Sequence, residues 1–484
     1  MKHRAAFFAQ HINVYNIISF TTFYIMKSRN ILLGHLLLQS VQAAMLVSSD
    51  SGTSSIVWSQ CDLDLGNEVK SESQKAYDCA KFSVPLDYSN EDSSEPLVLD
   101  LIKANATRQP SKGSVFYNPG GPGASGVSSV IVMGDRLVDI LGRHYDIISF
   151  DPRGSGQTLV STCVGSLDHP PSTLSSWKIF GRGANAVTHD DWERIKGDAW
   201  RDAGKLADAC YEDNADTGRF YGTPFVARDI VKIADALGQG NQINYWGTSY
   251  GTVLGQVLAA MFPSRINRML LNSNLFADEY FAGTWKSDTK DAEKAILHFF
   301  DECLAAGPRA CSLAANYSTK ESLLEAYNEL QRSYLLDGTL STTGRSSSKA
   351  DWFEWLVISH LYTPALYPQL DERIKGALEG NETAAFLLFD SATDYKVESA
   401  FHMITCGDAS FRADTPDDLF SIYQTILDQG PFGDTIASAR LRCARWKFQA
   451  AEQIDANSLR RIKTKHPVLI VNGIYDPITP LISA

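Results

Sequence analysis

Short apolar runs alternate with amphipathic stretches along much of the chain. Runs rich in Val, Ile, Leu and aromatic residues predict strands, and apolar residues spaced three and four positions apart predict helices at 224–238 and 251–262. Short apolar strands that alternate with helices are typical of a parallel sheet covered on both faces. The predicted strands are 82–88, 97–102, 114–117, 145–150, 243–246, 266–271 and 467–471.

This alternation stops after residue 275 and returns only at the last predicted strand. The segment in between is rich in helical patterns, at 291–305, 320–335, 352–360 and 416–429, and it contains a Ser/Thr/Gly-rich stretch at 338–348 that predicts a loop. We therefore expect an α/β core in two parts, residues 45–275 and 461–484, with an inserted, mainly helical cap at 276–460.

The first 44 residues have the layout of a secretory signal peptide. A positive start at Met26 is followed by an apolar run at 31–38 and by small residues at 41–44 that fit a cleavage site. The run is short for a membrane anchor, and His35 and Gln39 interrupt it. The pattern predicts a secreted protein without stable membrane association, and Met26 is an alternative start.

Cysteine usage agrees with an oxidising compartment. The eight cysteines include no CxxC pair, and sequence alone allows 105 pairings. Pairing of nearest neighbours would close only local loops. We expect the bonds 61–79, 163–210, 303–311 and 406–443.

Composition narrows the functional class. The chain has 484 residues with 44% hydrophobic and 21% charged positions, as in ordinary globular proteins and unlike disordered chains. Its 44 Lys and Arg against 56 Asp and Glu leave a net charge of −12, which argues against a nucleic-acid partner.

The clearest chemical motif is Gly-Thr-Ser-Tyr-Gly at 247–251, between a predicted strand and a predicted helix. A serine hydroxyl becomes a useful nucleophile when a tight turn presents it at the sheet edge, before a helix N-terminus that stabilises negative charge. The ordinary alternative is a glycine-rich turn. The strand–turn–helix context favours Ser249 as a nucleophile.

A second glycine-rich loop, at 118–123, follows the predicted strand 114–117. Acyl transfer needs backbone N–H groups aimed at the developing oxyanion. Pro122 has no N–H, so Gly121 is the best donor on this loop, together with the amide of Tyr250. The loop lacks the Lys-Ser/Thr of a phosphate-binding loop and the spacing of a dinucleotide fingerprint. No cofactor and no metal ion are therefore expected.

Asp476 follows the last predicted strand, in the chain order Ser…Asp expected of this layout. In that position a carboxylate would orient and charge-stabilise a histidine. An Asp in a surface turn before proline is the ordinary alternative.

Four short motifs follow one another along the chain, at 118–123, 151–156, 247–252 and 472–480. Together they resemble one family, the α/β-hydrolases of the tripeptidyl aminopeptidase and proline iminopeptidase type, over residues 56–484. The similarity is to secreted microbial members with a tripeptidyl-aminopeptidase-like C-terminal segment. It implies an α/β-hydrolase fold with Ser249 as nucleophile, Asp476 as triad acid and an oxyanion hole at Gly121 and Tyr250. It also implies release of short peptides or residues from free N-termini.

The chain departs from this family in two places. Relatives carry Asp-Gly where this chain has Asn272 and Ser273. The family's histidine follows the Asp after one more strand, whereas this sequence stops at Ala484, and none of its ten histidines falls at the expected edge. From sequence we expect that the last strand, the last helix and the catalytic histidine are missing through truncation, which would leave this chain inactive or weakly active.

Three functions remain open: a secreted aminopeptidase, a carboxylesterase and a catalytically dead binding protein. The substrate would be a small peptide or an ester. A cap carboxylate that binds a substrate ammonium would favour the peptidase, with Glu279 and Asp278 as candidates, although acids at a helix start commonly serve only the helix dipole. A wholly apolar cap pocket would favour esters.

Overall fold

The structure is a computed structural model. It describes residues 55–65, 70–163, 189–238, 240, 242–336, 339–342, 345–386, 395–427, 430, 432–433 and 441–484. The predicted signal peptide lies outside these ranges. Within them, no helix combines the length and the apolar character needed to cross a membrane.

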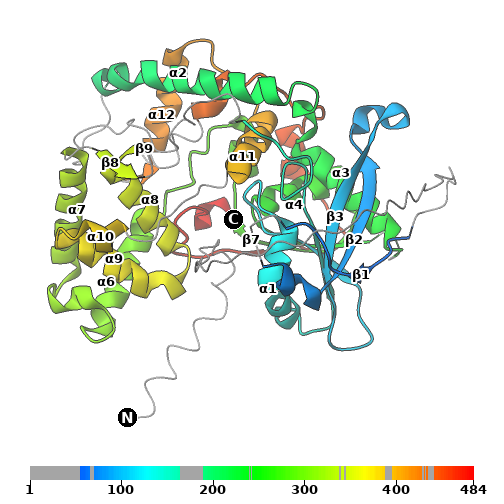
Figure 1. The fold of residues 1–484 in the computed structure, drawn as a ribbon, viewed down its shortest axis with the longest axis horizontal. Coiled ribbons are helices and arrows are strands. Elements are labelled where there is room, and N and C mark those ends of the chain that lie inside the picture. The colour runs from blue at the N-terminus through cyan, green and yellow to red at the C-terminus, as the bar shows by residue number, and fades with distance from the viewer. Residues whose placement is uncertain are drawn as a thin grey trace, which may run out of the picture.

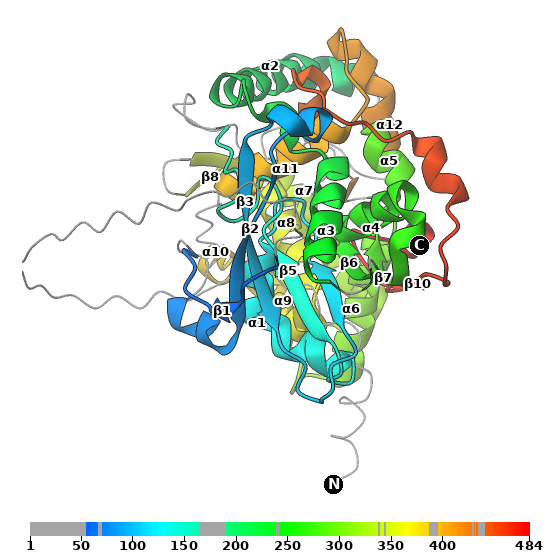
Figure 2. The same ribbon diagram turned by 90° about the vertical axis from the view of Figure 1, so that its right-hand side faces the viewer.

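An eight-stranded sheet forms the core (Figures 1 and 2). The predicted 82–88 and 97–102 strands form an antiparallel pair, and the five strands beyond this pair in the sheet run parallel to one another. The mostly parallel sheet predicted from sequence is therefore confirmed. Its order is β1 (Ser59–Gln60), β2 (Asp78–Pro85), β3 (Pro96–Ala104), β5 (Asp146–Phe150), β4 (Ser114–Asn118), β6 (Ile243–Ser249), β7 (Ile266–Asn274) and β10 (Leu469–Val471).

Successive residues of the central strands enter two separate cores, because side chains of a strand point alternately to opposite faces. Phe116 and Tyr245 pack with α3 (Thr223–Ala236) and α4 (Tyr250–Met261), whereas Tyr117 and Trp246 pack with α1 (Gly126–Ile140). Both faces of the sheet are therefore covered by helices, as the continuous apolar runs predict.

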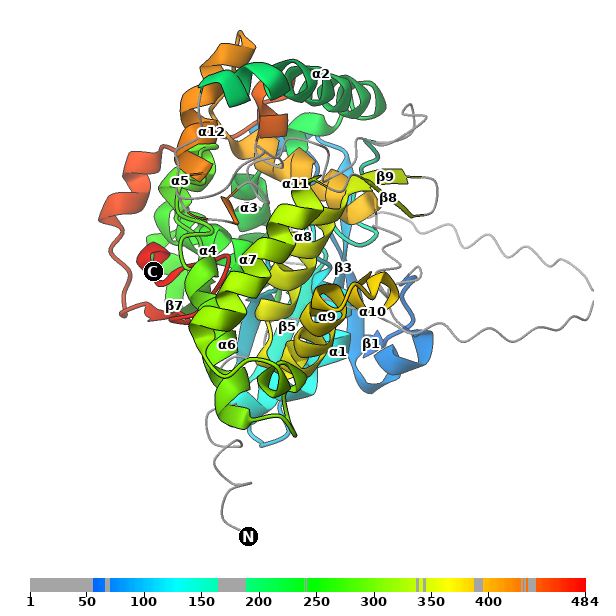
Figure 3. The ribbon, with the colours of Figure 1, turned by 90° about the vertical axis from the view of Figure 1, so that its left-hand side faces the viewer.

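Part of the helical segment after residue 275 packs on itself, whereas Tyr280, Met403 and Ile404 join the core beside the sheet. Figure 3 shows α6–α10 lying together beside the sheet. Their shared core contains Phe299, Phe300 and Phe353. The segment contains α5 (Ala277–Ala282), α6 (Ala292–Ala306), α7 (Lys320–Leu336), α8 (Lys349–Leu361), α9 (Tyr367–Leu378), α10 (Glu382–Phe386), α11 (Tyr395–Asp408) and α12 (Phe420–Leu427).

One long helix lies before the predicted cap but packs against it. α2 (His189–Asp213) places Trp192 in a cluster with Leu419, Ile422 and Tyr423, next to α12 (Figure 1). The cap layer is therefore built from two segments of the chain, and sequence order alone assigned α2 to the core.

The loop predicted at 338–348 is wrong for most of its length. β8 (Thr339–Thr342) pairs antiparallel with β9 (Arg345–Ser348). Two short neighbouring segments can form their own ladder, and a Ser/Thr-rich composition does not prevent this.

All four expected disulfides are confirmed: Cys61–Cys79, Cys163–Cys210, Cys303–Cys311 and Cys406–Cys443.

Candidate active site

Ser249 lies at the carboxyl end of β6 and directly precedes α4. Its φ of 56° and ψ of −125° lie in a region that side chains rarely adopt, and its side chain is only partly buried. The strand fixes one side of this turn and the helix fixes the other. The hydroxyl therefore stands at the sheet edge with the amide end of α4 beside it, the arrangement of a nucleophile elbow.

The two glycines of the motif are required by close backbone packing. A Cβ at Gly247 would come within 2.1 Å of the Gly251 carbonyl oxygen, and a Cβ at Gly251 within 2.6 Å of the Asn118 carbonyl oxygen. Since neither backbone oxygen can move freely, only glycine fits at the two positions.

The predicted oxyanion loop reaches the elbow through Gly120. At this residue, with φ of +103°, a Cβ would lie 2.8 Å from Cβ of Ser249 and 3.1 Å from the Tyr250 nitrogen. The Gly120 amide donates to Asn118 Oδ1 at 3.1 Å. The loop and the elbow are therefore in direct contact, and Gly121 carries the next amide along the loop.

Asp151 holds the far end of this loop. Its Oδ1 accepts from Ser125 Oγ at 2.7 Å and from the Val127 amide at 3.0 Å, at the N-terminus of α1. Asp151 is 4% exposed. The 151–156 motif therefore holds the segment that joins the oxyanion loop to α1, a contact that no sequence pattern predicts.

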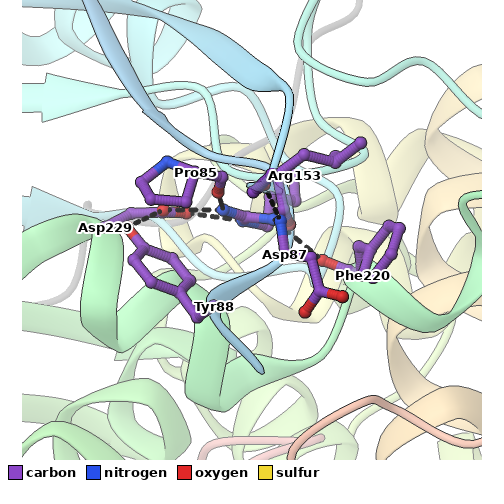
Figure 4. A network of polar contacts seen from close by, with 8 residues as sticks. Pro85, Asp87, Tyr88, Arg153, Phe220 and Asp229 are labelled. Atoms are coloured by element: carbon purple, nitrogen blue, oxygen red, sulfur yellow. Dashed lines mark hydrogen bonds and ion pairs between the residues drawn. The ribbon is translucent and has the colours of Figure 1, made fainter. Parts of the chain in front are cut away.

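Arg153 anchors the same motif to the core. Its guanidinium is fully buried and pairs with both carboxylate oxygens of Asp229 on α3, at 2.8 and 2.9 Å (Figure 4). It also donates to the carbonyl oxygens of Pro85 and Leu86, and Tyr88 donates to Asp229 at 2.8 Å. Burial tends to lower the pKa of Arg153, but the neighbouring carboxylate raises it overall, so the buried guanidinium stays protonated.

Asp476 lies at the same edge of the sheet as Ser249. Ser249 pairs in register with Asn274 of β7, whose amide donates to Asn472 Oδ1 at 2.6 Å, just after β10. Asp476 Oδ1 in turn accepts from the amides of Ile478 and Thr479. Burial raises the pKa of the Asp476 carboxyl above its ordinary value, although these hydrogen bonds oppose the shift.

Comparisons with known proteins agree with this geometry. Residues 113–304 match the alpha/beta hydrolase fold family, and residues 428–484 match the family of TAP-like proteins. The chain belongs to the α/β-hydrolases.

Several curated relatives of this α/β-hydrolase are peptidases by name. The tripeptidyl aminopeptidase of Streptomyces coelicolor is 28% identical over 281 residues, 54% of this chain and 49% of the relative. The serine protease Hip1 of Mycobacterium tuberculosis is 24% identical over 416 residues, 83% of this chain and 76% of the relative. Carboxylesterase B of the same organism is 28% identical over 428 residues, which again cover 83% of this chain and 76% of the relative. The match to the tripeptidyl aminopeptidases spans about half of their length.

At the two positions where the hydrolase departs from its family's pattern, the side chains of Asn272 and Ser273 both have polar neighbours. Asn272 Oδ1 accepts from Trp246 Nε1 at 2.6 Å and from Thr248 Oγ1 at 2.8 Å, which ties β7 to β6 below the elbow. The Ser273 side chain lies near Asp476 and acts to lower the pKa of its carboxyl, against the effect of burial. The departure thus adds a polar partner to the candidate triad acid.

The two carboxylates considered for ammonium binding are engaged in other contacts. Asp278 pairs with Arg460 at 2.6 Å, and Glu279 accepts from the amide and hydroxyl of Ser287, both at 2.9 Å. These contacts give both side chains structural roles within the cap layer.

Three cap histidines have partners of their own. His298 stacks on Tyr475, the neighbour of Asp476, with ring centroids 3.8 Å apart. His360 and His402 each bond through Nδ1 to a backbone carbonyl of their own helix. These contacts give the three cap histidines structural partners, and none of the three is assigned as the catalytic histidine expected from sequence.

Cys303, Cys311 and Asp371 lie close enough together to suggest a metal site, but their chemistry does not fit one. The two sulfurs are joined in a disulfide, and Asp371 accepts from the amides of Ser312 and Leu313. A disulfide offers no thiolate ligand, so the group is structural.

A buried carboxyl group that the sequence did not single out lies beneath the elbow. Asp408 is 2% exposed and accepts from the Thr223 amide at 3.0 Å and from Tyr280 Oη at 2.9 Å. Burial raises the pKa of Asp408 to about 6, against the opposing effect of these hydrogen bonds. No spacing rule could have found it, since its partners come from two distant elements, Thr223 on α3 and Tyr280 on α5.

Proposed function

We propose that this α/β-hydrolase is a serine hydrolase that works through an acyl-enzyme on Ser249. The observation that carries the proposal is the elbow itself: a serine at φ 56°, at the start of α4, with Gly120 of the glycine-rich loop packed against it. Strained serine turns of this kind expose the hydroxyl for attack on a carbonyl.

In this mechanism Ser249 Oγ attacks the carbonyl carbon of the substrate, and a general base takes the hydroxyl proton. Negative charge develops on the carbonyl oxygen, where the amides of Gly121 and Tyr250 would donate hydrogen bonds. Asp476 would orient the base and stabilise its positive charge. The leaving group takes a proton from that base, and water then releases the acyl group by the reverse sequence.

We further propose that the substrate is a peptide with a free N-terminus, from which the enzyme releases short peptides or single residues. Relatives named tripeptidyl aminopeptidase and serine protease support this choice. Secretion is part of the same proposal. It is supported by the signal-like sequence at 26–44 and by four disulfides, which form and persist in oxidising compartments.

A carboxylesterase is the second candidate. A relative with that name is 28% identical over 83% of this chain, and Asp278 and Glu279 already have structural partners. An ester substrate would use the same serine and the same oxyanion donors.

The test combines active-site labelling with a substrate panel. The full-length protein and its Ser249→Ala variant are treated with a fluorophosphonate probe, and then with a tripeptidyl amide, its N-acetylated counterpart and a simple ester. Ser359→Ala, which changes a serine hydroxyl on α8, is the matched control.

Because no histidine is assigned as the general base, we expect weak labelling that requires Ser249, and slow hydrolysis of the free tripeptidyl amide but not of the acetylated one. Turnover of the ester alone would establish the carboxylesterase. Absence of both labelling and turnover would overturn the serine hydrolase and leave a binding protein.

A further inference from the structure

A chain of buried hydroxyl groups links the cap to the residue after the nucleophile. Tyr250 Oη lies 2.6 Å from Thr223 Oγ1, and Thr223 Oγ1 donates to Asp408 Oδ2. Tyr250, Thr223 and Asp408 are all 2% exposed or less. The three residues come from the starts of α4 and α3 and from the end of α11.

The direction of each hydrogen bond in this chain follows from the number of protons. The single hydroxyl proton of Thr223 goes to Asp408, so the proton between Tyr250 and Thr223 must come from Tyr250. Asp408 also accepts from the Thr223 amide, at the N-terminus of α3, where the helix dipole favours a negative charge. The ionised carboxylate therefore orients the hydroxyl of Tyr250 through Thr223.

The helix that carries Asp408 also covers the oxyanion loop. At Gly123 a Cβ would lie 2.9 Å from Cβ of Ala400 and 3.1 Å from the Val397 carbonyl oxygen, both on α11. One end of α11 thus packs on the loop, and its last residue is linked through Thr223 to Tyr250 of the elbow. This cap helix is therefore connected to both proposed sources of oxyanion donors, directly to the loop and indirectly to Tyr250.

We propose that Asp408 is a positioning residue for the reaction at Ser249, which it serves by fixing, through Thr223, the side chain of Tyr250. The Tyr250 amide is the first of α4 and one of the two proposed oxyanion donors, so a shift of its side chain would move that donor. The proposal rests on the proposed function, because it assigns a role in the same reaction. It predicts that the cap governs the geometry of the site, beyond covering it.

The test uses variants that interrupt the hydrogen-bond chain from Tyr250 through Thr223 to Asp408 at successive residues. Thr223→Val removes the central hydroxyl and keeps the shape, whereas Thr223→Ser keeps the hydroxyl. Tyr250→Phe removes the terminal donor. Asp408→Asn places an amide donor against Thr223, so that the Tyr250 proton loses its acceptor. Tyr88→Phe is the matched control, since it removes a buried tyrosine donor to a different carboxylate, Asp229.

For each variant the maximal rate of fluorophosphonate labelling (kinact) and the half-saturating probe concentration (KI) are measured, together with the melting temperature. We expect Thr223→Val, Tyr250→Phe and Asp408→Asn to lower kinact about 10-fold while KI changes little, because donors shifted by a fraction of an ångström stabilise the transition state less. Thr223→Ser should restore the rate. Tyr88→Phe should lower the melting temperature and leave kinact unchanged.

The double variant Thr223→Val/Tyr250→Phe shows whether the two hydroxyl groups act together in one hydrogen-bond chain. We expect it to be no slower than either single variant, because both remove the same link. Wild-type rates in the single variants, or losses that multiply in the double variant, would overturn the positioning role. A wild-type protein that does not label at Ser249 would overturn the proposed function itself, and this inference with it.

Discussion

Gly120 is the residue at which the oxyanion loop and the nucleophile elbow meet. Its φ of +103° and the 2.5 Å separation between a Cβ there and the Thr248 carbonyl oxygen leave no space for a side chain. We expect Gly120→Ala to lower kinact at Ser249 by about 100-fold, because the loop must move away from the serine.

Gly238→Ala is the control for this substitution. Gly238 also has a positive φ, of +66°, but nothing lies within 4 Å of a Cβ there. It should therefore cost about 1 kcal/mol of unfolding free energy, the price of the backbone conformation, without changing kinact. If the two alanine variants lose labelling equally, the contact at Gly120 does not matter for the reaction.

Asp408 predicts an unusual dependence of stability on pH. Its pKa is about 6 in the folded protein and ordinarily 3.8, so the folded state holds a proton that the unfolded state has lost between these values. The resulting stabilisation is complete below pH 4 and is lost as the pH rises through 6. A shift of about 2 pKa units corresponds to about 3 kcal/mol.

Asp408→Asn, which cannot titrate, isolates this contribution. Urea unfolding of both proteins at pH 4 and pH 7 should show that wild type loses about 2.4 kcal/mol more than the variant over this interval, since part of the shift lies below pH 4. Other carboxyl groups titrate in both proteins and cancel in the difference. Equal pH dependence in the two proteins would mean that Asp408 titrates normally.

At the scale of elements, the buried Arg153–Asp229 pair joins the 151–156 loop, the end of β2 and α3 (Figure 4). Arg153→Met would leave the Asp229 charge buried without its partner. We expect a loss of about 3–5 kcal/mol in the free energy of unfolding, measured by urea denaturation.

A second substitution, Asp229→Asn, should recover part of this loss when it is combined with Arg153→Met, because the uncompensated charge is then gone. Recovery should be incomplete, since the carbonyl oxygens of Pro85 and Leu86 also lose a donor. If the double variant loses as much as the sum of the two single variants, the destabilisation does not come from the buried charge.

Sequence patterns predicted the elements whose signals are local. The strand before Ser249, the helix after it and the glycines at 247 and 251 follow from apolar periodicity and from turn chemistry. The same patterns missed the β8–β9 hairpin, whose Ser/Thr-rich strands carry little apolar alternation. They also could not place α2 in the cap layer, because Trp192 packs on Tyr423, more than 200 residues later in the chain.

The same limit applies to the candidate site. Ser249 and the loop at Gly120 were predictable because each lies within a short motif. The roles of Asp408 and Asp278 depend on partners that only tertiary packing supplies, namely Thr223 and Tyr280 for the first and Arg460 for the second. A pattern that specifies residue types at fixed spacing contains no information on such contacts.

For the whole molecule, the disulfides were predictable from sequence order since each joins neighbours along the chain. Their sequence separations are 18, 47, 8 and 37 residues. Cys163–Cys210 links the segment that follows the 151–156 motif to α2. Cys406–Cys443 links α11 to the turn Arg442–Arg445. Two of the four bonds thus fasten the two-segment cap layer.

The bonds should contribute unequally to stability, because a cross-link restricts the unfolded chain more when it closes a longer loop. From chain entropy we expect about 4 kcal/mol for the 47-residue separation of Cys163–Cys210 and about 2.5 kcal/mol for the 8-residue separation of Cys303–Cys311. Replacing each pair by alanine and comparing urea unfolding tests this order. All four sulfurs are buried, so the packing lost is similar in the two variants. A larger loss for Cys303–Cys311 would show that local packing around α6, and not the length of the closed loop, determines what a disulfide contributes to this protein.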